Sequence, residues 1–61
     1  MRNDLNKTDR MILENVDTFG EYVFAINRSS NIREIESASK LNDLGLISRQ
    51  YDEDFIICKG V

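Results

Sequence analysis

Apolar residues in the first third of the chain recur with the spacing of an α-helix. Ile12, Val16 and Phe19 are four and three positions apart, so a helix places them on one face. We expect Leu5 and Met11 to pack beside them. The pattern therefore predicts an amphipathic helix that buries this face against the rest of the chain.

Polar residues and a glycine mark the two ends of this helix. The side chain of Asn6 can accept a backbone hydrogen bond at the N-cap, and Thr8 is a later candidate for the same position. Asp9 then falls in the first turn, where the helix dipole favours negative charge. Gly20 is predicted to end the helix, because glycine readily adopts the left-handed conformation found there.

The segment at residues 21–27 is rich in β-branched and aromatic side chains, which predicts a strand. Alternation turns its two aromatic residues and Ile26 to one side, and Val23 and Ala25 to the other. Both sides are apolar, which is typical of a strand paired at its edges and covered by helices. A helix through these residues is the chief alternative.

A second helical pattern occupies residues 30–44, after a polar break in which Ser30 is the predicted N-cap. Every third residue is apolar, and this spacing gives a broad apolar arc on a helix. The residues of this arc are Ile32, Ile35, Ala38, Leu41 and Leu44. The opposite, polar arc contains Arg33, Glu36, Ser37, Lys40 and Asp43. Gly45 is predicted to end the helix in a Schellman motif, with Leu46 folding back on it.

The last segment reads as a β-hairpin, because residues 47–51 alternate apolar and polar, Asp52-Glu53-Asp54 is a polar turn, and residues 55–59 form a second strand. The whole chain therefore predicts one α+β domain over residues 1–61, in the order αβαββ. We expect a three-stranded antiparallel sheet packed against two helices on one face.

Two stretches resemble a winged helix-turn-helix domain. Residues 8–14 look like the first helix of such domains, and residues 41–49 are similar to the Leu-x-x-Leu-Gly-Leu-Ile-x-Arg junction between recognition helix and wing in MarR-like and ArsR-like regulators. Only 24 residues separate Gly20 from Gly45, too few for a strand and two full helices. The resemblance therefore implies a winged helix reduced by about one helix.

The resemblance implies a small transcriptional regulator that binds double-stranded DNA through residues 30–44, as a dimer if the surface has to be enlarged. Asn31 and Arg33 carry groups that can read adenine and guanine edges, while Arg28 and Arg49 would contact phosphates. The side chains assigned to nucleic-acid binding are Arg28, Ser30, Asn31, Arg33, Ser37, Lys40 and Arg49.

The distribution of charge also fits other interpretations of the helix face and of the acidic turn. Eight basic and eleven acidic residues give a net charge of −3, and residues 28–50 carry four basic and three acidic groups. That balance also fits an ordinary solvated helix face, supported by the i,i+4 pair Glu36 and Lys40. Asp52, Glu53 and Asp54 would repel phosphates, so they indicate either a turn that keeps the hairpin soluble or a contact for a basic protein surface.

The second hypothesis is therefore a protein-binding adaptor or inhibitor module that makes no nucleic-acid contact. Its contact would be the acidic hairpin at Asp52, Glu53 and Asp54, or an exposed face of the sheet. A chain of this size would also suit an accessory protein encoded by a phage or a plasmid.

The residue types present argue against catalysis and against metal binding. Histidine is absent and the serines have no partner at triad spacing, so we expect no enzyme, no cofactor and no metal site. The acidic turn lacks the spacing and glycine of a calcium-binding loop. Cys58 is expected to be a small buried hydrophobe, and the aromatic residues to be core or interface contacts.

The expected location is the cytoplasm. A lone cysteine cannot form an internal disulfide, which favours a reducing compartment. Residues 1–7 are charged and lack the apolar run of a signal peptide, and no segment approaches the roughly 20 apolar residues of a membrane span.

Overall fold

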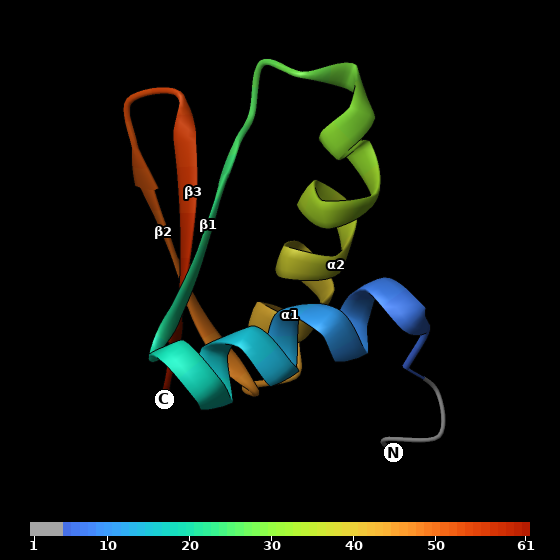
Figure 1. Cartoon of the computed structure of the whole chain (residues 1–61), viewed down its shortest axis with the longest axis vertical. Helices are drawn as coiled ribbons and strands as arrows, with labels where there is room; N and C mark the ends of the chain where they lie inside the picture. Colours follow the sequence, from blue (N-terminus) through green and yellow to red (C-terminus); the bar gives the residue numbers. More distant parts are fainter. Residues whose placement is uncertain (1–4) are drawn as a thin grey trace.

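Two helices and three strands follow one another in the predicted order αβαββ. The structure is a computed structural model that describes residues 5–61 (Figure 1). The elements are α1 (Lys7–Phe19), β1 (Glu21–Ala25), a short 3-10 turn η2 (Ser29–Asn31), α2 (Ile32–Asp43), β2 (Ile47–Asp52) and β3 (Phe55–Gly60). Residues 1–4, on which part of the argument against a signal peptide depends, lie outside the described residues.

The predicted N-cap of α1 is confirmed and is a complete capping box. The Asp9 amide donates to Asn6 Oδ1 at 2.8 Å, and the Asn6 amide donates to Asp9 Oδ2 at 3.0 Å. Gly20 ends the helix as predicted, with a left-handed φ of 86° and its amide bonded to the carbonyl of Val16.

The prediction that Phe19 packs into the core is wrong, because its side chain is 73% exposed. The buried stripe of α1 runs through Asp9, Ile12, Leu13 and Val16. At about 100° per residue, Phe19 falls at the margin of that stripe, and it is also the last residue of the helix. Leu13, which the spacing argument left out, takes part in the core instead.

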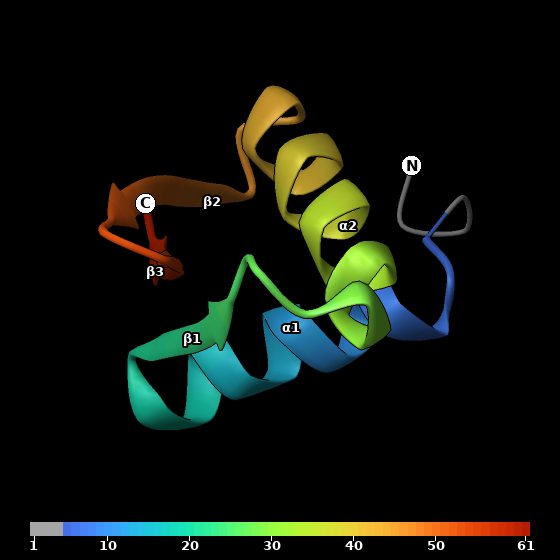
Figure 2. The same ribbon diagram turned by 90° about the horizontal axis from the view of Figure 1, so that it is seen from above.

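The segment after α1 is a strand, so its helical alternative is excluded, although β1 ends at Ala25 and not at residue 27. The sheet order is β1-β3-β2, and both neighbouring pairs are antiparallel. Figures 1 and 2 show that α1 and α2 lie on the same side of this sheet, so only one side of β1 is covered by helices.

The start of α2 differs from the prediction, whereas its end agrees with it. Ser30 lies inside η2 and is not the N-cap, because the 3-10 turn delays the start of the α-helix to Ile32. At the other end the Schellman motif is confirmed: Gly45 has φ 77°, its amide bonds the carbonyl of Asn42, and the amide of Leu46 bonds that of Leu41.

The core lies between the covered face of the sheet and the two helices (Figure 2). Its residues are Leu5, Ile12, Leu13, Val16, Phe24, Ala38, Leu41, Ile47, Ile56 and Cys58. Ile32 and Leu44 were expected in the apolar arc of α2, but they lie at its two ends and are exposed. Ser37 was expected on the polar arc and is buried where α2 faces α1.

Candidate functional site

Lys40, one of the residues assigned to nucleic-acid binding, is anchored to α1. Its Nζ lies 2.8 Å from Asp9 Oδ2, and the Asp9 side chain is fully buried. Burial by itself raises the pKa of Asp9, but hydrogen bonds from Lys40, the Ser37 hydroxyl and the Asn6 amide, together with the Lys40 charge, outweigh burial and hold that pKa below its usual value. Lys40 therefore joins the two helices.

Asn31, assigned to reading bases, instead holds the outer edge of the sheet. Its Nδ2 donates to the carbonyl of Ala25 in the edge strand β1 at 2.8 Å. At the far end of α2, Asn42 Oδ1 accepts the amide of Arg49 in the other edge strand, β2, at 3.1 Å. The two asparagines therefore occupy backbone groups that an incoming strand would need, one at each edge. Neither the spacing nor the charge pattern along the chain indicated a role for Asn42.

The residues of the nucleic-acid set other than Asn31 lie in three places: a cleft between the helices, strand β2, and the start of α2. Arg33, Ser37 and Lys40 line a cleft of about 400 Å³ between α1 and α2, together with the acidic residues Asp9 and Glu36. Arg49 lies on β2, with its guanidinium carbon 5.3 Å from the centre of the Tyr51 ring.

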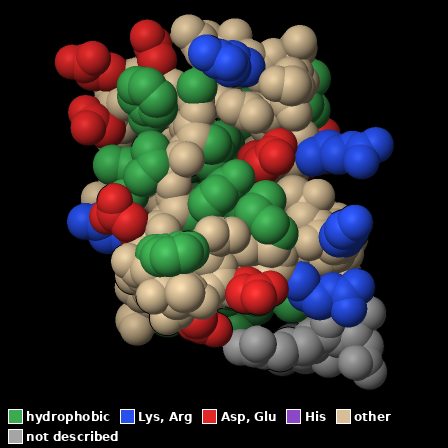
Figure 3. Space-filling model, viewed as in Figure 1, with side chains coloured by type: hydrophobic (Ala, Val, Ile, Leu, Met, Phe, Trp, Pro, Cys, Tyr) green, Lys and Arg blue, Asp and Glu red, His purple; other side chains and the backbone are tan. Residues whose placement is uncertain are grey.

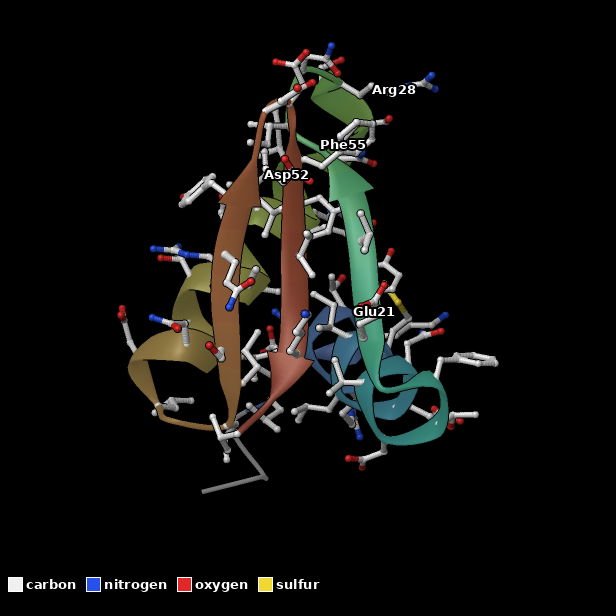
Figure 4. All side chains as sticks on the ribbon, turned by 90° about the vertical axis from the view of Figure 1, so that its left-hand side faces the viewer. Glu21, Arg28, Asp52 and Phe55 are labelled. Carbon is white, nitrogen blue, oxygen red and sulfur yellow. The ribbon has the colours of Figure 1, made fainter. Side chains whose placement is uncertain are left out.

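Arg28 and Ser30 are exposed near the start of α2, and Arg28 points away from the sheet (Figure 4). Asn31, which closes η2, is half-buried and bonded to β1. The structure thus brings three of the seven residues together in one cleft, but it does not gather the set on a single open surface.

The side of the sheet away from the helices, which we call the open face, is apolar at its centre. Directly opposed residues of antiparallel strands turn their side chains to the same side, and so do alternate residues of one strand. The register therefore arranges the open face in three rows across β1, β3 and β2. The rows are Glu21, Lys59 and Ser48; then Val23, Ile57 and Gln50; then Ala25, Phe55 and Asp52.

Large apolar side chains of the open face are accessible to solvent. Val23 is 43% exposed and Phe55 is 46% exposed, while Ala25 and Ile57 are half-buried beside them. Figure 4 looks onto this face, with Phe55 and Asp52 toward the hairpin turn and Glu21 toward the opposite end. An apolar centre with charged residues at both ends is the arrangement of a small protein interface.

Acidic side chains gather over the turn between β2 and β3 (Figure 3). Asp52, Glu53 and Asp54 are all exposed, and Glu53 has a left-handed φ of 55°. The carbonyl of Asp54 accepts the amide of Ile26 at 2.7 Å, which ties the turn to the chain after β1. The acidic turn therefore lies at the Phe55 end of the open face.

Cys58 is a buried hydrophobe, as predicted. Burial raises the pKa of its thiol to about 11, although the positive charge of Arg49 acts to lower it. Within residues 5–61 there is no group of three potential metal ligands, and no helix is long and apolar enough to cross a membrane.

No model of a known protein family matches the chain, and comparisons with curated proteins and with solved structures gave no significant match.

Proposed function

We propose that this chain is a protein-binding module whose contact surface is the open face of the sheet. The observation that carries the proposal is the exposure of Val23 and Phe55 on a face that neither helix covers. A partner that covers such side chains releases the water in contact with them. This release stabilises the complex by about 25 cal/mol for each Å² of apolar surface buried. The acidic turn at the end of the face would favour a partner that carries basic residues beside its apolar ones.

Hydrogen bonds at both edges of the sheet favour the open face, and not an edge strand, as the contact surface. A partner that added a strand to β1 would compete with Asn31 for the carbonyl of Ala25. One that added a strand to β2 would compete with Asn42 for the amide of Arg49. Losing either hydrogen bond costs free energy before any new pairing is gained, so a partner meets less resistance on the face.

The alternative, a reduced winged helix that binds DNA, is less well supported by the same contacts. Arg28, Ser30 and Arg33 are exposed and could meet a phosphate backbone. Lys40 is paired with a buried carboxylate, Asn31 is bonded to β1, and the acidic turn would repel phosphate. We therefore keep DNA binding as an outcome of the experiment and not as a second proposal.

Selection from a random peptide library tests the proposal and does not require the natural partner to be identified. Peptides that bind the wild-type protein should lose binding to Val23→Lys and to Phe55→Lys. They should retain binding to Phe19→Lys, which places the same charge on an apolar side chain that is also exposed but lies on α1. We expect nuclear magnetic resonance shifts on binding to concentrate in β1 and β3.

Two results would count against the proposal. The first is a set of selected peptides that binds the two open-face variants as well as it binds the wild type. The second is binding of duplex DNA at low salt that weakens steeply as salt is added and is lost in Arg33→Ala, since that is the behaviour of a phosphate contact.

A further inference from the structure

We propose that residues 29–36, which we call the latch, open as one unit about a hinge at Ser37 while the rest of the fold stays closed, and that this opening uncovers the outer edge of β1. The latch consists of η2 and the first part of α2, up to Glu36. The inference does not depend on the proposed function, because it concerns an edge of the sheet and not its open face.

Burial divides α2 into a weakly packed first part and a firmly packed second part. All of η2 lies within the described residues, and none of its side chains is buried. Ile32 is 53% exposed, whereas the buried residues of α2 are Ser37, Ala38 and Leu41, which all follow the latch. Figure 1 shows the start of α2 standing away from α1, while its later turns cross α1. Local opening occurs where few apolar groups are buried, so this boundary predicts the hinge.

The latch is attached to the sheet through Asn31 and to the core through Ile35. The side-chain amide of Asn31 donates to the carbonyl of Ala25 in β1 at 2.8 Å, and Ile35 packs against the core while remaining partly exposed. Because Asn31 uses its side chain in this way, it does not cap α2, and no side-chain cap at that end is found in the part of the chain that the structure describes. A helix end without a cap is less stable, so the start of α2 opens more readily.

Glu34 adds a destabilising feature to the closed latch. Its Oε2 atom is buried, and no group among residues 5–61 forms a hydrogen bond with it. Burial raises the pKa of the Tyr22 hydroxyl, and the negative charge of Glu34 raises it further, so the carboxylate lies near that residue of β1. A buried carboxylate oxygen without a partner costs free energy. Opening of the latch returns Glu34 to water and removes this cost.

Opening of the latch also changes the outer edge of β1. A residue in an antiparallel strand points its own amide and carbonyl to the same side, so Ala25 turns both groups toward the latch. Val23, two positions earlier in β1, has the same orientation. Once Asn31 leaves the carbonyl of Ala25, an extended strand can pair with these backbone groups. The latch therefore controls when β1 can accept another strand.

Native-state hydrogen exchange followed by nuclear magnetic resonance tests the inference. The amides of residues 36–40 bond carbonyls four positions earlier, which all lie in the latch, whereas the amides of residues 41–44 bond carbonyls after it. We expect residues 36–40 to share one protection factor and one urea dependence, with protection at least about tenfold below that of residues 41–44 and of β3. Protection that rises gradually along α2, or that equals the protection of β3 at residues 36–40, would overturn the latch as a unit.

Two substitutions should change the latch in opposite directions. Asn31→Ala removes the hydrogen bond to β1 and should speed exchange at residues 36–40 about fivefold. Glu34→Met keeps an unbranched side chain but removes the buried carboxylate, and it should slow the same exchange about fivefold. A general loss of stability cannot produce this slower exchange. An unchanged rate in Asn31→Ala, or an unchanged or faster rate in Glu34→Met, would overturn the contacts assigned to the latch.

Each substitution has a matched control. Asn42→Ala removes a similar side-chain hydrogen bond at the other edge of the sheet, and Glu36→Met removes an exposed carboxylate from the same helix. Both should leave exchange at residues 36–40 within about twofold of the wild type. If Asn42→Ala speeds this exchange as much as Asn31→Ala does, these amides exchange by global unfolding and the inference fails. An effect of Glu36→Met as large as that of Glu34→Met would refute the role of the buried oxygen.

Failure of the latch and failure of the proposed function are distinguishable. Hydrogen exchange in α2 measures the latch, whereas loss of peptide binding in Val23→Lys and Phe55→Lys measures the open face. Either result can be obtained without the other.

Discussion

The contact between Lys40 and Asp9 should contribute measurably to stability, and Lys40→Met should reveal how much. The substitution keeps an unbranched side chain of similar length but removes the ammonium group from a fully buried carboxylate. A hydrogen bond to a charged group contributes about 1.5–3 kcal/mol. The Lys40 side chain is 40% exposed, so solvent screens its charge, and we expect a loss of about 1–2 kcal/mol in the free energy of unfolding at about pH 7.

The stability difference between the wild type and Lys40→Met is also expected to depend on pH. The pKa of Asp9 is lowered in the folded protein, so its contribution to stability is present above the unfolded-state pKa near 3.8 and is lost as pH falls through the folded-state pKa. In Lys40→Met the main group that lowers this pKa is gone, while burial still raises it. The stability difference between wild type and variant should therefore shrink as pH falls below about 4.

Urea unfolding followed by circular dichroism, at about pH 7 and at about pH 3, measures both effects. Lys7→Met is the matched control, because Lys7 lines the same cleft but is exposed, and it should change stability by less than about 0.5 kcal/mol. Equal stability of wild type and Lys40→Met at about pH 7 would refute the reasoning. So would a stability difference that stays constant down to about pH 3.

Three further predictions concern the sheet and its turn. Asn42→Ala frees the amide of Arg49 at the edge of β2. It should therefore lower the free energy of unfolding by about 1 kcal/mol and increase light scattering at high concentration. Unchanged unfolding and scattering would contradict this role. Glu53→Asn should raise thermal stability by about 0.5–1 kcal/mol, because asparagine tolerates the left-handed φ of 55° better; a lower melting temperature would argue against it. The Cys58 thiol should react with a thiol reagent only after denaturation, because it is buried and its pKa is raised to about 11, and rapid labelling of the native protein would disprove this.

Features that depend on a few neighbouring residues could be predicted from the sequence. The capping box joins Asn6 to Asp9, three positions away, and the glycines at 20 and 45 end their helices because only the local backbone has to turn. The strand at residues 21–25 and the hairpin followed from alternation and side-chain type. These local signals were enough to give the order αβαββ and the placement of both helices on one face of the sheet.

The burial of single residues was predicted less well, because it depends on which stripe of a helix meets the sheet. Spacing alone placed Phe19 in the core, yet the packed stripe passes through Leu13 and Val16 and leaves Phe19 in solvent. The broad arc predicted for α2 was too wide for the same reason. Ile32 and Leu44 at its ends are exposed, while Ser37 is buried against α1.

The roles of Lys40, Asn31 and Asn42 were decided by tertiary structure alone. Lys40 and Asp9 are 31 positions apart, and nothing in the local sequence of either residue indicates the other. Asn31 and Asn42 hold the two edges of the sheet only because α2 extends from β1 to β2. The open face likewise depends on long-range pairing, since Val23 meets Ile57 only through the register of β1 and β3.

The sequence by itself therefore determined the elements, their order and the glycine ends of both helices, because those depend on backbone preferences within a few residues. Only the tertiary structure determined which polar groups form internal contacts and which apolar side chains remain exposed. The candidate surface moved from the helix at residues 30–44 to the open face of the sheet for that physical reason.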